Sequence, residues 1–107
     1  MSSHVQTYLD HLTRVTRVSP HTLRATAADL RDFEMFFEAA AVDVPPLPLD
    51  RLDRPAVRAY LASLADRNSP RTMARKLATL RGFYRHLVRA ATIDASPMDG
   101  LVNPRQK

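Results

Sequence analysis

Seven basic residues and no acidic residue lie between positions 67 and 89 of this chain of 107 residues. They are Arg67, Arg71, Arg75, Lys76, Arg81, Arg85 and Arg89. The planar guanidinium group of arginine presents a fork of donors that suits phosphate oxygens and guanine edges. This density of arginine makes nucleic acid the leading partner. The alternative is a solvated helix face in a protein that simply favours arginine.

The same segment is predicted to be an amphipathic helix, because its apolar residues recur at helical spacing. The buried side should hold Met73, Leu77, Leu80, Tyr84 and Leu87. The opposite side should present Arg71, Arg75, Ala78, Thr79, Gly82, Arg85, His86 and Arg89, with Thr72 and Lys76 on its flank. Small residues at 78 and 82 would let the helix approach a DNA groove while Arg and Thr side chains reach phosphates and base edges. Packing explains Gly82 equally well.

A related pattern occurs fifty positions earlier. The string Ser19-Pro20-His21-Thr22-Leu23 is repeated as Ser69-Pro70-Arg71-Thr72-Met73. Serine followed by proline is a common helix opening, with the hydroxyl as N-cap. Both helix N-termini also offer amides and a threonine hydroxyl to phosphates.

The helix that begins at Ser19-Pro20 is therefore a second candidate DNA-binding surface. Its outward residues are predicted to be His21, Arg24, Ala25, Ala28 and Arg31. Acidic residues lie toward its far half, so only the first two turns suit DNA: Asp29, Asp32, Glu34 and Glu38. For these residues an ordinary solvated face is the stronger alternative.

The pattern of apolar residues and start signals predicts four helices and no strands, an all-α fold. The first runs from about 3 to 17, the second starts at Ser19-Pro20, the third is capped by Asp53 and the fourth by Ser69, ending near 90. The first helix should bury Val5, Tyr8, Leu9, Leu12 and Val15. The second should bury Leu23, Leu30, Phe33 and Phe37, and the third Val57, Tyr60, Leu61 and Leu64. Residues 42–50 contain three prolines and are predicted to form an extended linker, and Ser96-Pro97 opens a short turn.

Composition limits the class of protein. The length predicts one domain, and the charge is uneven: residues 1–53 carry five Arg and eight acids, whereas residues 54–107 carry eleven basic residues and three acids. The absence of cysteine excludes disulfides, a thiolate zinc site and a thiol nucleophile. The sequence shows neither a signal peptide nor a membrane-spanning run, so we expect a cytoplasmic protein.

Catalytic and cofactor motifs are missing from this sequence. It has no Gly-rich phosphate loop with a lysine and no closely spaced histidine and carboxylates. The four histidines are scattered, which predicts no metal site, and Tyr8, Tyr60 and Tyr84 fall on apolar stripes, which predicts core packing. We expect no cofactor and no enzymatic activity from this chain alone.

The fourth-helix string from Ser69 to Tyr84, with Val18–Leu23, Asp29–Phe33 and Val57–Leu61, resembles the N-terminal core-binding domain of Xer-type tyrosine recombinases and phage integrases. The resemblance covers about residues 4–104. It implies a four- to five-helix SAM-like bundle of two crossed helical hairpins. It further implies that residues 1–104 form a DNA-binding domain and that residues 105–107 begin a linker to a catalytic domain, with its tyrosine nucleophile, that this chain lacks.

The resemblance also implies a set of DNA contacts and partners. The positions that match DNA-contacting places in the family are Thr22, Arg24, Ala28 and Arg31 on the second helix, and Arg71, Thr72, Arg75, Lys76 and Thr79 on the fourth. The implied partners are double-stranded DNA at a recombination half-site and, in a full-length protein, other protomers of a tetrameric synapse. The isolated domain is expected to be a monomer that binds and does not cut.

Two other interpretations remain open. The chain could be a helical protein-interaction domain that docks an acidic or helical partner through its first and fourth helices. A transcription-type helix-turn-helix protein is disfavoured, because the connections, notably residues 42–50, are too long for the tight turn between paired helices.

Overall fold

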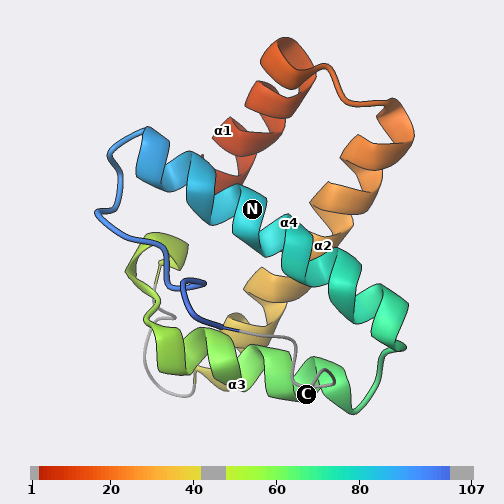
Figure 1. The fold of residues 1–107 in the computed structure, drawn as a ribbon, viewed down its shortest axis with the longest axis vertical. Coiled ribbons are helices and arrows are strands. Elements are labelled where there is room, and N and C mark those ends of the chain that lie inside the picture. The colour runs from red at the N-terminus through yellow and green to blue at the C-terminus, as the bar shows by residue number, and fades with distance from the viewer. Residues whose placement is uncertain (1–2, 42–47, 102–107) are drawn as a thin grey trace. The chain divides into compact units, whose positions relative to one another are not determined.

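The computed structural model describes residues 3–41 and 48–101, which divide between two compact units, 1–50 and 51–107. The described residues form four α-helices and no strand, which confirms the all-α prediction (Figure 1). The helices are α1 (Ser3–His11), α2 (Pro20–Ala40), α3 (Arg54–Ala65) and α4 (Pro70–Arg89). Most of the predicted linker and all of residues 105–107 lie outside the described residues. At the end of the linker, Leu49 and Asp50 belong to a 3₁₀ turn, η2 (Leu49–Arg51), so the predicted extended conformation was wrong for these two residues.

In the first unit, α1 does not continue to residue 17 as an α-helix. It gives way to a π-helical turn, η1 (Leu12–Thr16), which ends at Arg17 in the left-handed conformation (φ 56°). Val5, Tyr8, Leu9 and Leu12 are buried as predicted.

Val15, by contrast, is 68% exposed, so its predicted core position was wrong. A π turn closes i→i+5 hydrogen bonds and advances fewer degrees per residue than an α turn. The register of the apolar stripe is therefore lost after Leu12.

The long helix α2 starts where its capping sequence predicts and contacts α1. Leu30 and Phe33 are fully buried, whereas Leu23 and Phe37, which lie toward the two ends of the helix, are half-buried. The rings of Phe33 and Phe37 meet edge to face, with centroids 5.1 Å apart. Edge-to-face contact is one of the geometries that aromatic pairs prefer.

In the second unit, α3 begins at Asp53, whose carboxylate accepts a hydrogen bond from the Ala56 N–H (3.0 Å). All the predicted core residues of this helix are buried: Val57, Tyr60, Leu61 and Leu64. α3 contacts α4, and together with the turn after α4 they build the core of this unit.

α4 buries every residue of its predicted stripe, and in addition Phe83. The helix ends in a Schellman motif, in which Thr92 N–H donates to Leu87 O (2.9 Å) and Ala91 N–H to Val88 O (3.0 Å). Ala91 takes the left-handed conformation that this motif needs (φ 58°). The predicted turn at Ser96-Pro97 is present as well, with Asp99 N–H donating to Ser96 O (3.1 Å).

Candidate nucleic-acid interface

α4 separates its cations from its core. Its exposed residues include Arg71, Arg75, Ala78, Arg81, Arg85 and Arg89, while the six buried residues that face inward are all apolar or aromatic. From Pro70 to Arg89 the helix contains no acidic residue. The result is an exposed, cationic helix face, which we call the α4 arginine face, formed by Arg71, Arg75, Arg85 and Arg89 around Ala78.

Three of the predicted site residues lie at the edge of this face. Thr72, Lys76 and Thr79 are half-buried, because they lie on the flank that continues into buried Phe83. The Thr79 hydroxyl donates to the Arg75 backbone carbonyl (3.2 Å), a local bond typical of threonine within a helix. This bond engages the hydroxyl proton of Thr79 within the helix.

The N-terminus of α4 is closed by Ser69. Its Oγ accepts from the Thr72 N–H (3.2 Å) and donates to Thr72 Oγ1 (3.2 Å). The Thr72 amide is therefore satisfied within the cap, whereas the Thr72 hydroxyl accepts one bond and still has its own proton to donate. The cap thus positions a hydroxyl donor beside Arg71 and Arg75 at the start of the arginine face.

α2 begins with nearly the same geometry. Ser19 Oγ accepts from the Thr22 N–H (3.1 Å) and donates to Thr22 Oγ1 (3.0 Å). The backbone of Ser19 (φ −63°, ψ 155°) matches that of Ser69 (φ −69°, ψ 160°). The repeated sequence therefore produces a repeated local structure.

The outward side of α2 presents the remaining predicted site residues. Thr22, Arg24, Ala28 and Arg31 are all exposed. They belong to the first unit and the α4 residues to the second, so each set is brought together on its own helix.

Two acidic residues of α2 lie in positions that the sequence pattern did not predict. Asp29 is 5% and Glu34 7% exposed, so both carboxylates are buried instead of lying on the solvated far half of the helix. Charged residues are rarely buried without partners, and composition gives no signal that distinguishes them from exposed ones. The exposed surface of α2 therefore carries fewer acidic side chains than the four in its sequence.

Neither a metal-ligand cluster nor a membrane helix was found among residues 3–41 and 48–101. No group of three or more His, Asp or Glu side chains in this part of the chain could hold a metal ion. None of its helices has the length and apolarity needed to cross a bilayer.

Comparisons with known proteins identify the family of this chain. The family model for the phage integrase, N-terminal SAM-like domain, matches residues 5–91. The chain belongs to this family.

The similar curated proteins are tyrosine recombinases. The tyrosine recombinase XerC of Pelobacter propionicus is 35% identical over 97 residues, covering 91% of this chain and 32% of the relative. The XerC proteins of Chlorobaculum parvum (35% over 104 residues, 94% and 31%) and Myxococcus xanthus (33% over 105 residues, 98% and 34%) are similar to it as well. The chain thus spans about a third of the length of these relatives. No solved structure matches.

Proposed function

We propose that this chain is the DNA-binding N-terminal domain of a site-specific tyrosine recombinase, and that the α4 arginine face contacts duplex DNA. The observation that carries the proposal is the exposure of Arg71, Arg75, Arg85 and Arg89 on a helix that has no acidic residue. Such a face attracts the phosphate backbone at long range and forms charge-assisted hydrogen bonds on contact.

Each α4 residue has a distinct role in this proposal. Arg71 and Arg75 donate to phosphates or to guanine edges, and Lys76 supplies a point charge from the flank. The Thr72 hydroxyl donates its remaining proton to a phosphate, and Thr79 Oγ1 accepts from a base amino group. Ala78, which has no side chain beyond Cβ, lets the helix axis approach the groove.

The outward residues of α2 form the second part of the proposed interface. Arg24 and Arg31 are the phosphate contacts, Thr22 repeats the hydroxyl donor of Thr72, and Ala28 allows close approach. The similar capping geometry of the two helices supports the same use of their first turns.

The biological role is inferred from the relatives whose N-terminal third this chain resembles. Residues 1–104 would hold a recombination half-site, and residues 105–107 would lead to a domain that performs strand exchange. Other recombinase protomers would assemble on the same DNA, whereas this chain by itself would be monomeric and would not cut DNA. A protein that acts on bacterial chromosomal DNA works in the cytoplasm.

The proposal is tested by removing two cations from α4. Arg75→Ala combined with Lys76→Ala should weaken binding to a duplex in a fluorescence anisotropy titration at moderate salt. Arg54→Ala combined with Arg58→Ala, on the exposed surface of α3, is the matched control because it removes the same charge from a helix outside the proposed interface. Circular dichroism should show unchanged helicity for both. Equal affinities of the two double variants would contradict the proposal.

One observation favours a second candidate, a protein-interaction domain. Val15 and Met35 in the first unit are 68% and 50% exposed, two large apolar side chains that a partner protein could cover. A domain of that class would associate with itself or with a helical protein and would bind duplex DNA only weakly. Sedimentation of the chain with and without duplex distinguishes the two functions. A DNA-binding domain sediments as a monomer and shifts when duplex is added, whereas a protein-interaction domain self-associates and is little changed by duplex.

A further inference from the structure

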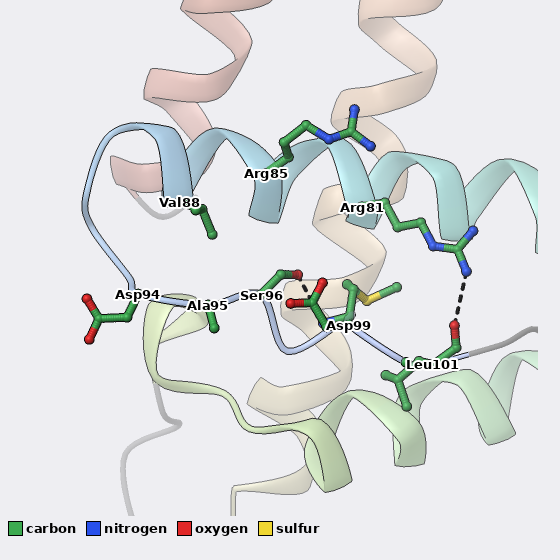
Figure 2. A pocket seen from close by; sticks show the side chains of 10 residues that line it. Arg81, Arg85, Val88, Asp94, Ala95, Ser96, Asp99 and Leu101 are labelled. Carbon is green, nitrogen blue, oxygen red and sulfur yellow. Dashed lines mark hydrogen bonds between the residues drawn. The ribbon is translucent and has the colours of Figure 1, made fainter.

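The segment after α4 runs back along the helix that precedes it. Past the Schellman motif, residues 94–101 face Arg81, Arg85 and Val88 across an open pocket (Figure 2). The chain therefore returns toward the middle of α4, and Leu101 lies beside Arg81, twenty residues away in sequence.

The returning segment has a defined structure of its own. Ser96 Oγ accepts from the Met98 N–H (3.0 Å), and Leu101 N–H donates to Met98 O (3.1 Å). The side chains of Met98 and Leu101 are buried, at 3% and 7% exposure. Gly100 supplies the left-handed backbone (φ 80°) that the end of this turn needs. We call residues 96–101 the return turn.

Arg81 of α4 is hydrogen-bonded to the end of this turn. Arg81 Nη2 donates a hydrogen bond of 3.0 Å to the backbone carbonyl of Leu101. Arg85, one helical turn further, also lines the pocket, but in Figure 2 no dashed line joins its guanidinium group to the turn. A charged donor on a backbone carbonyl forms a stronger bond than a neutral one, and this bond joins two segments that share no helical hydrogen bond.

We propose that Arg81 is a positioning residue for the return turn and not one of the DNA contacts of α4. By holding the carbonyl of Leu101 it fixes the position of the return turn against α4. Arg81 thereby differs from the residues of the α4 arginine face, because its guanidinium group is hydrogen-bonded to the return turn. This inference rests on hydrogen bonds within the second unit and does not require the proposed function.

Distance measurements test the positioning directly. The chain has no cysteine, so Ala74→Cys and Asp99→Cys, both at exposed positions, give two unique sites for nitroxide labels. We expect a single narrow distance distribution by double electron–electron resonance. Arg81→Met keeps the aliphatic stem but removes the donor, and it should broaden the distribution. Arg85→Met, the matched control, should leave it narrow.

A second readout separates positioning from DNA contact. The salt dependence of duplex binding should be the same for Arg81→Met and the unaltered chain, whereas Arg75→Ala should reduce the magnitude of the slope by about 0.9, the value of one phosphate contact. The inference would be overturned if Arg81→Met kept a narrow distance distribution. It would also be overturned if Arg81→Met reduced the magnitude of the salt-dependence slope as much as Arg75→Ala does. If Arg75→Ala also leaves the slope unchanged, the proposed function fails while the distance distributions still decide the role of Arg81.

Discussion

The two Ser-Pro helices, α2 and α4, begin alike but differ in their later turns. Their capping hydrogen bonds agree within 0.2 Å, from 3.1 and 3.0 Å at Ser19 to 3.2 and 3.2 Å at Ser69. Beyond the cap, α4 has no acidic residue, whereas α2 carries four and buries two of them. The cap therefore determines where a helix starts, and the residues of the later turns determine what its surface can bind.

The first prediction concerns the cores behind both helices, where the largest effects are expected. Phe33 in α2 and Phe83 in α4 are fully buried. Replacing either with alanine should lower the free energy of unfolding by about 3–5 kcal/mol, through lost burial and the cavity left behind. Urea denaturation followed by circular dichroism measures this. A loss below about 1 kcal/mol for Phe83→Ala would show that α4 is not held by its apolar side.

The second prediction compares the two arginine surfaces. Arg75→Ala in α4 should weaken duplex binding by about 1–3 kcal/mol. Arg24→Ala in α2 should cost less, because α2 as a whole carries four acidic residues, which weaken its attraction for phosphates. Both variants are compared in one anisotropy titration at a single salt concentration. A greater loss from Arg24→Ala would make α2 the main DNA-binding helix.

The third prediction concerns the two caps. Ser19→Ala and Ser69→Ala should each destabilise the protein by about 1 kcal/mol, because each removes the acceptor of one N-terminal amide. Since the two caps have similar geometry, the two losses in thermal or urea unfolding should agree. If only one variant loses stability, the resemblance between the caps does not extend to their energetics.

The smallest effects are expected where the backbone is left-handed after α4. Ala91 has φ 58° and Gly100 has φ 80°. Ala91→Gly should raise stability by up to about 1 kcal/mol by removing the Cβ clash, and Gly100→Ala should lower it by a similar amount. The space around Gly100 is open, with no heavy atom within 4 Å of an added Cβ, so its effect reports backbone conformation alone. Shifts of the same sign for both variants would contradict this explanation.

Features set by near neighbours in the sequence could be predicted. The caps at Ser19, Asp53 and Ser69 were correct because a side chain meets an amide three residues away. The core positions of α3 and α4 could be predicted from helical periodicity, which holds as long as the helix stays regular. Val15 failed where the regular helix ends in a π turn.

Features set by distant parts of the chain could not be predicted. Phe83 lies outside the stripe expected from the wheel, and its burial depends on the segments that pack beside α4. The burial of Asp29 and Glu34 depends likewise on tertiary surroundings. Arg81 and Arg85 are both arginines of α4, and nothing in the local sequence distinguishes them. Arg81 acquires its partner, the carbonyl of Leu101, because the chain returns to α4 twenty residues later. The DNA contacts named on α2 and α4 stay predictions.

The salt dependence of duplex binding tests the central claim, contact between the α4 arginine face and DNA, most directly. The logarithm of the binding constant should fall linearly with the logarithm of salt concentration. Arg75→Ala with Lys76→Ala should reduce the magnitude of the slope by about 0.9–1.8, for one or two lost phosphate contacts, while Arg54→Ala with Arg58→Ala leaves the slope unchanged. The same slope for both double variants and the unaltered chain would contradict the account.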